Sequence, residues 1–159
     1  MDRTKNNNVE GIAVKGFFRL QIRDKKTKRI VGDTGYRGNV VTNYGFESCI
    51  VALPLKCANS LQASGMMLGS GTAPATDAVA LDNSLTEYWA SFAQSTVVAS
   101  LTARATASFD GTLGAATLVN IGLFAASTGS LIAGNTFDSS AITTDQDINC
   151  TYQLVYSRV

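Results

Sequence analysis

The chain has 159 residues, enough for one domain with a sizeable core, and its 45% apolar and 16% charged residues exclude a disordered protein. The net charge is only +1, but residues 1–37 hold ten Lys and Arg against four Asp and Glu, and the remainder holds three against eight. A basic N-terminal segment therefore precedes an acidic body, and the absence of histidine excludes Ser-His-Asp and Cys-His catalytic pairs.

The cysteines and the first residues bear on the compartment and on cofactors. Cys49, Cys57 and Cys150 are odd in number and fit no zinc spacing, so we expect buried thiols and neither a disulfide framework nor a metal. The first residues lack the apolar run of a signal peptide, and no stretch is long enough to span a bilayer. Gly69 and Gly71 are not followed by the lysine of a phosphate-binding loop, so we expect no nucleotide cofactor.

The N-terminal part of the chain predicts an arm and a hairpin. Residues 1–9 are polar and predict a loose arm that carries Arg3 and Lys5. In the stretch "GFFRLQIRD", apolar and polar residues alternate, which predicts a half-buried strand. A charged turn and the stretch "RIVGDTGY" then complete a β-hairpin over residues 10–36, ahead of a body over residues 37–159.

The end of this hairpin is basic, and three interpretations of its charge remain open. The simplest is a solvated edge whose lysines discourage pairing with other strands. Docking onto an acidic protein surface comes second, and phosphate contact with a nucleic acid is least favoured, because no nucleic-acid-binding motif is present. The cations concerned are Arg23, Lys25, Lys26, Lys28 and Arg29.

A change of period after the hairpin predicts one helix over residues 43–53. Asn43 is a typical N-cap residue, and Glu47 places a negative charge in the first turns. Pro54 ends the helix. The residues that share the apolar face at helical spacing are Phe46, Cys49, Ile50 and Leu53.

The rest of the chain reads mainly as strands separated by short turns. The stretch 85–92 is ambiguous, whereas 116–125 is nearly continuously apolar and predicts a strand covered on both faces. Many short strands and one helix predict an antiparallel β-sandwich, jelly-roll-like in organisation. The predicted strands are 61–68, 96–109, 116–125, the stretch "LIAGNTFD" and 147–158.

Two side-chain groups raise questions of chemistry. Asp145 and Asp147 offer oxygen ligands for calcium, but a solvated turn before the last strand is the simpler interpretation. Tyr88, Trp89 and Phe92 form an aromatic cluster on which a sugar could stack, with Tyr88 and Trp89 as the candidate contacts. The alternative is that Trp89 packs into the core beside the loop 68–81, and it is the more economical of the two.

The order of the segments is more informative than any single motif. "GNVVTNYGFESCI", "MMLGSGTAPATDAVALDNSL", "VASLTARATASF", "LVNIGLFAASTGSLIAGNTF" and "INCTYQLVYS" follow one another over about residues 35–159. This series resembles a family of tailed-bacteriophage virion proteins, which have Asn-Val-Val-Thr-Asn before a helix, a Gly-x-Gly-Thr-x-x-Pro loop and a Gly-Leu-Phe strand. Asn120 departs from the pattern, because members often have an acidic residue there.

The resemblance implies a non-enzymatic structural protein without a cofactor, located in the virion. The leading hypothesis is a capsid decoration or cement protein that binds the outside of the shell and stabilises neighbouring subunits. The expected partners are the major capsid protein or other virion proteins, with Arg3, Lys5 and the hairpin cations as contacts and no membrane or nucleic acid involved. By analogy we expect a homo-oligomer, with a trimer at local threefold points. The alternatives are a tail, neck, fibre or baseplate component, or a carbohydrate-binding module for host recognition.

Overall fold

The computed structural model of the chain describes residues 11–47, 62–99, 101–111, 116–125 and 129–159. The predicted arm, with Arg3 and Lys5, lies outside these residues, as do Cys49, Cys57 and most of the predicted helix. No helix within the described segments is long and apolar enough to cross a membrane.

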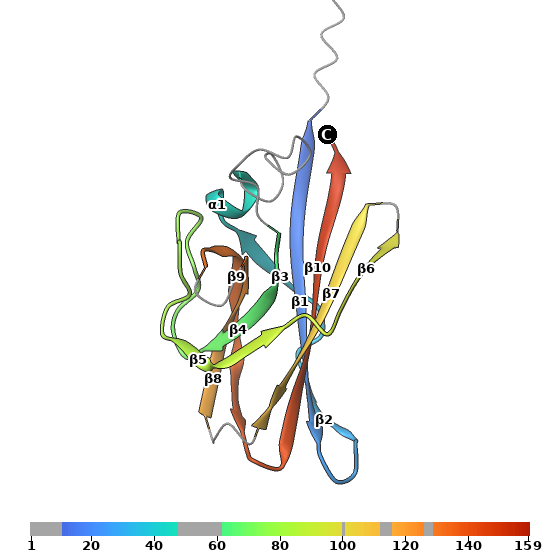
Figure 1. Cartoon of the computed structure of the whole chain (residues 1–159), viewed down its shortest axis with the longest axis vertical. Coiled ribbons are helices and arrows are strands. Elements are labelled where there is room, and N and C mark those ends of the chain that lie inside the picture. The colour runs from blue at the N-terminus through green and yellow to red at the C-terminus, as the bar shows by residue number, and fades with distance from the viewer. Residues whose placement is uncertain (1–10, 48–61, 100, 112–115, 126–128) are drawn as a thin grey trace, which may run out of the picture.

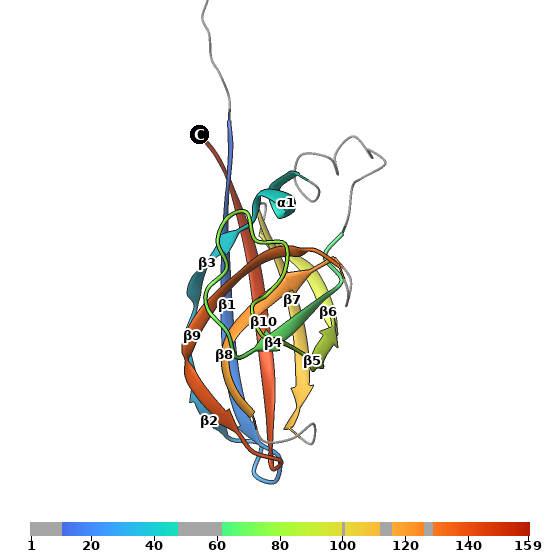
Figure 2. The ribbon, with the colours of Figure 1, turned by 90° about the vertical axis from the view of Figure 1, so that its left-hand side faces the viewer.

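The described residues form ten antiparallel strands in one strongly curved sheet that folds into two layers (Figures 1 and 2). The strand order is β5-β4-β8-β9-β3-β1-β10-β7-β6, and β2 pairs with β1 beside this series. The predicted antiparallel β-sandwich with an N-terminal hairpin is therefore confirmed. The strands are β1 Ile12–Asp24, β2 Ile30–Asp33, β3 Arg37–Val41, β4 Gly65–Gly69, β5 Ser84–Ser91, β6 Gln94–Ala99, β7 Thr102–Asp110, β8 Ala116–Phe124, β9 Leu131–Ile142 and β10 Gln146–Arg158.

Strand β3 joins the two layers. Its first half pairs with β1, where Asn39 lies opposite Gly16, and its second half pairs with β9, where Val40 lies opposite Gly134. A strand that changes sheets in this way makes a corner between two packed layers. Because β3 leaves β1 after Asn39, the beginning of β1 has a neighbour on only one side within the described structure, namely β10.

The core lies between the two layers and follows the alternation in the sequence. Phe18 and Leu20 of β1 are buried, and their register partners on β10, Tyr152 and Cys150, are buried beside them. Strand β8 is covered on both faces as predicted, since residues 121–124 are all buried. Burial of large apolar side chains stabilises each by about 1.5–3 kcal/mol, so this core dominates the stability of the sandwich.

The predicted strand 96–109 is wrong as a single element. It consists of β6 and β7, which pair with each other, so that Val97 lies opposite Ala103. Both residues have odd numbers, as do most of the other apolar residues of this stretch. The alternation of apolar and polar residues therefore continues from β6 into β7, and it gives no sign of the turn between them. No glycine, asparagine or proline marks the turn between Ala99 and Thr102.

The predicted helix is also different where it is described. α1 covers only Asn43–Gly45, and its N-cap is Thr42 rather than Asn43. The Thr42 hydroxyl oxygen accepts a hydrogen bond from the Gly45 main-chain N–H at 3.0 Å and lies 2.6 Å from the main-chain oxygen of Leu131. Thr42 is fully buried, so it caps the helix and ties it to β9 at the same time.

Candidate functional site

The basic hairpin is the candidate site, and its turn is fixed by local hydrogen bonds. Asp24 ends β1, and its carboxylate accepts hydrogen bonds from the main-chain N–H and the hydroxyl of Thr27 at 2.6 and 2.8 Å. These bonds lower the pKa of Asp24. Lys28 adopts a positive φ of 58° and donates its main-chain N–H to the Asp24 main-chain oxygen at 2.9 Å. The hairpin therefore has a defined end.

Lys25 does not belong to the exposed charge of the hairpin. Its ammonium pairs with Asp110 at the end of β7, lies 3.6 Å from Asp147 of β10 and donates to the Thr144 main-chain oxygen at 2.8 Å. The hydrogen bond to Asp110 is the main cause of the raised pKa of Lys25. Lys25 therefore has a contact within the molecule that the sequence did not predict, and it anchors the hairpin to the sandwich. Asp147 is engaged in the same pair, and no cluster of three metal-binding side chains exists among the described residues.

Arg23 is also partly withdrawn from the surface. It lies opposite Asp147 in the β1–β10 register, and its buried Nε has no hydrogen-bond partner among the described residues. With Lys28 and Asp110 it lines a cavity of about 340 Å³ at this end of the molecule. Of the five predicted hairpin cations, Arg23 and Lys25 therefore lie beside the ends of β7 and β10, although Lys25 is the first residue of the turn.

The remaining cations are exposed beside apolar side chains. Ile30 and Val31 of β2 are 48% and 58% exposed, which is unusual for a strand packed on a core. We call this end of the hairpin, in which exposed cations and apolar residues adjoin, the hairpin tip. It projects beyond the sandwich at the end opposite the C-terminus (Figure 1). Its residues are Lys26, Lys28, Arg29, Ile30 and Val31.

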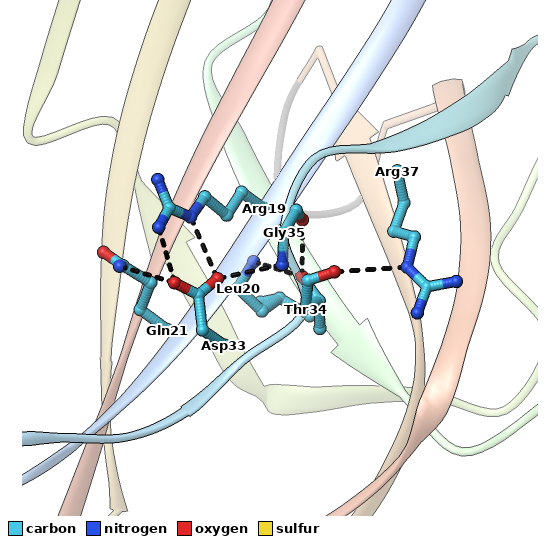
Figure 3. Close-up of polar contacts among 7 residues, drawn as sticks. All are labelled: Arg19, Leu20, Gln21, Asp33, Thr34, Gly35 and Arg37. Carbon is cyan, nitrogen blue, oxygen red and sulfur yellow. Dashed lines mark hydrogen bonds and ion pairs between the residues drawn. The ribbon is translucent and has the colours of Figure 1, made fainter.

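A polar network that sequence reasoning missed fixes β2 against β1 (Figure 3). Two nitrogens of Arg19 donate to the two carboxylate oxygens of Asp33, and Gln21 donates to Asp33 at 3.0 Å. The same carboxylate accepts the main-chain N–H of Gly35, whose φ of 64° turns the chain toward β3. The bond from Arg19 is the main cause of the strongly lowered pKa of Asp33. In the hairpin register, Gln21 lies opposite Asp33, and Arg19 is the diagonal neighbour of Asp33. Knowledge of this register would have predicted the Arg19–Asp33 pair.

The aromatic cluster belongs to the core rather than to an open sugar-binding face. Tyr88 is 1% exposed, so the prediction that its ring contacts a glycan is corrected. Trp89 is half-buried and packs edge-to-face on Phe124, with 6.1 Å between ring centroids. It joins a small apolar cluster with Leu81 of the loop 68–81, which confirms the interpretation that Trp89 packs beside that loop.

The loop 68–81 is held down along its length. The Asp82 carboxylate accepts the main-chain N–H and the hydroxyl of Thr72, both at 2.9 Å, which lowers the pKa of Asp82. Asn120 of β8 is fully buried and donates its amide to the main-chain oxygens of Thr72 and Asp82. The main chain of Val79 accepts a bond from Leu131 of β9. The loop is therefore tied to β8 and β9 by hydrogen bonds.

Comparisons with protein-family models, curated proteins and solved structures gave no match to this chain. The functional interpretation therefore depends on the geometry of the hairpin and on the order of the sequence segments. The hairpin combines a fixed base with an exposed basic and apolar tip, which is an arrangement suited to contact with another macromolecule.

Proposed function

We propose that this chain is a non-enzymatic structural protein of a tailed-bacteriophage particle, and that it decorates the outside of the capsid and stabilises neighbouring shell subunits. The resemblance of its ordered segments to virion proteins supports the class of protein. The hairpin tip supports the role, because it offers a compact surface for contact with a partner. The observation that supports this role most directly is the exposure of basic and apolar side chains together at the hairpin tip.

The arrangement of charge favours docking over a merely solvated edge. Lysines that only protect an edge need no fixed position, yet Lys25 and the Arg19–Asp33 pair hold both strands of this hairpin in place. A held surface loses less conformational entropy when it binds. The exposed Ile30 and Val31 add apolar area that a partner can cover, while the neighbouring cations select an acidic surface.

The test is binding of the purified chain to empty capsids of the phage that encodes it, prepared without this protein, with isolated tails as the comparison. Saturable binding to capsids, together with greater resistance of the capsids to heat, is the expected result. Binding to tails alone would replace the decoration role by a tail, neck or baseplate role. Absence of binding to both would contradict a structural role in the particle.

Two variants assign the binding to the hairpin tip. The double variant K26E/R29E reverses two exposed charges without touching the contacts of Lys25. We expect it to weaken capsid binding by about tenfold or more, mainly at low salt, because the contact is electrostatic. Arg158→Glu, which reverses a single exposed arginine at the end of β10, is the control for charge reversal away from the hairpin tip, and we expect it to leave the affinity unchanged.

A further inference from the structure

A second surface lies at the other end of the molecule, where β1 and β3 diverge. The two strands pair only from Gly16 to Phe18, and beyond this point a groove of about 630 Å³ opens between them. Its walls carry apolar side chains from both strands and from the segment after α1, where Phe46 is 39% exposed. The lining includes Val14, Phe17, Val40, Val41 and Phe46.

Among the described strands, none pairs with the main chain of β1 along this groove. Gly11 exchanges both of its main-chain hydrogen bonds with Val159 of the β10 strand end, at 2.9 and 3.0 Å. The main-chain N–H and C=O groups of successive residues point to alternate sides of a strand. Those of Ile12 and Val14 therefore point away from β10, toward the groove. The bond from Thr34 N–H to the Leu20 main-chain oxygen, on the same side as the groove, agrees with this alternation. Within the described residues, no strand pairs with Ile12 or Val14 on that side.

An unsatisfied amide lies at the apex of the groove. Both polar atoms of the Asn39 side chain are buried and have no hydrogen-bond partner within the described residues. Asn39 lies directly over Gly16, where a Cβ atom would come within 1.9 Å of the Asn39 Oδ1. A buried amide without partners costs about 1–3 kcal/mol. In an extended strand, the N–H and the carbonyl of one residue point to the same side, so one residue of an added strand offers the acceptor and the donor that the Asn39 amide lacks.

We infer that this groove receives the N-terminal segment, residues 1–9, of a second copy of the chain, which adds a strand to the free edge of β1. Ten residues precede Gly11, which lies three positions before the groove-lining Val14, and an extended chain of ten residues spans about 33 Å. Strand addition of this kind supplies affinity through main-chain hydrogen bonds.

The inference deepens the proposed function, because exchanged arms would hold copies of a particle protein together. The exchange of arms rests on the proposed function only for its role in a particle, because the groove and the free edge of β1 are features of the chain itself. The groove is lined by the beginning of β1 and by residues beside α1, which lie at the end of the molecule opposite β2 and the hairpin tip (Figure 1), so the two surfaces can be tested independently. A wild-type chain that forms the oligomer but does not bind capsids would count against the proposed function alone, and a monomeric wild-type chain that binds capsids would count against the groove alone.

The experiment compares the full chain with a variant lacking residues 1–9 and adds a synthetic peptide of residues 1–10 to the truncated protein. We expect the full chain to sediment as an oligomer and the truncated chain as a monomer. The peptide binds the truncated chain saturably and slows hydrogen exchange of the Ile12 and Val14 amides. A peptide with the same residues in scrambled order serves as the control.

Two substitutions test the atoms involved. Val14→Pro removes the donor that points into the groove and leaves the β10 ladder intact, whereas Val14→Ala keeps that donor. Asn39→Ala removes the unsatisfied amide. We expect Val14→Pro and Asn39→Ala each to weaken peptide binding by about tenfold, and Val14→Ala to have little effect. Circular dichroism checks that each variant is folded. If Val14→Pro unfolds, the test of the inference is peptide binding to Asn39→Ala together with hydrogen exchange of the Ile12 and Val14 amides.

Other occupants of the groove give different results. A monomeric full chain whose Val14 amide is protected would mean that the arm folds back onto its own molecule. A monomer whose Ile12 and Val14 amides exchange freely, with no peptide binding, would leave the groove to a different partner. An oligomer that survives removal of residues 1–9 would place the subunit contact elsewhere. Each of these outcomes overturns the inference.

Discussion

Asn120 of β8 donates its side-chain amide to the main-chain oxygen of Asp82 at 2.9 Å. The same amide nitrogen lies 3.2 Å from the main-chain oxygen of Thr72, so one buried side chain closes the two ends of the loop 68–81 over the sheet. The neighbours of this nitrogen are two carbonyl oxygens, which require a donor.

Replacing Asn120 by Asp therefore removes the donor and places a negative charge against two acceptors. We expect Asn120→Asp to lower the free energy of unfolding by about 2–4 kcal/mol at pH 7, measured by urea denaturation. Burial against two acceptors raises the pKa of the introduced acid, so the loss should diminish as the pH falls below that raised pKa and should be small by about pH 4, because the protonated acid donates one hydrogen bond. Asn135→Asp is the control: Asn135 also donates to a main-chain oxygen, that of Gly38 at 2.8 Å, but at the surface. An equal loss in both variants would contradict the role of burial.

Trp89 stabilises the fold by packing between the loop 68–81 and the sheet. Its ring lies against Phe124 and covers Gly65, where a Cβ atom would come within 2.4 Å of the indole. We expect Trp89→Ala to lower the free energy of unfolding by about 2–3 kcal/mol, less than for a fully buried tryptophan. Trp89→Phe should recover part of this loss. A glycan array that loses its signals in Trp89→Ala without any change in stability would favour the carbohydrate-binding alternative instead.

Cys150 is a core residue, and burial raises the pKa of its thiol well above the ordinary value. The thiolate is the reactive form, so the folded protein should protect this cysteine from thiol reagents. In a Cys49→Ser/Cys57→Ser background, we expect labelling of Cys150 by a disulfide reagent to occur only as fast as the protein unfolds. Labelling that proceeds at the rate of a free thiol in native buffer would contradict the burial of Cys150.

The elements that the sequence predicted well are those in which one local signal decides the outcome. Alternation identified β1 and β10, since each buries every second side chain against the same core. The connection between β6 and β7 escaped detection because its pairing keeps the alternation in phase. The corner in β3 carries no local signal, because it depends on which strands lie on either side of it.

The candidate site shows the same limit. Basic residues near the turn marked the hairpin correctly as the charged element, but charge alone does not separate Lys25 from Lys26. Lys25 finds Asp110, 85 residues away, only because β10 brings the end of β7 beside β1. The role of Asn39 likewise depends on Gly16, its partner across β1 and β3. Such pairings follow from the register of the sheet, which no single segment determines.

Lys25 should determine how firmly the hairpin is held. We expect Lys25→Met to increase hydrogen exchange of the amides in residues 24–31 while exchange in β8 stays unchanged, because the side chain bridges the turn to Asp110 and Asp147. Raising the salt concentration should make the wild-type hairpin exchange more like the variant, since the ion pairs are accessible to solvent. Lys26→Met, which removes the neighbouring exposed charge, is the control. Identical exchange in all three proteins would show that the pairs do not anchor the hairpin.

Asp33 links the stability of the hairpin to pH. Arg19 holds the pKa of Asp33 far below its ordinary value, so the folded protein keeps this carboxylate charged where the unfolded chain binds a proton. Its contribution is therefore complete above about pH 4 and is lost as the pH falls toward the lowered pKa. We expect Asp33→Asn to reduce the wild-type decline in thermal stability between about pH 4 and pH 2, measured by circular dichroism. Asp138→Asn is the control, because Asp138 pairs with Arg37 while remaining 94% exposed. A wild-type decline in stability that is unchanged in Asp33→Asn would show that the acid response arises from other carboxylates.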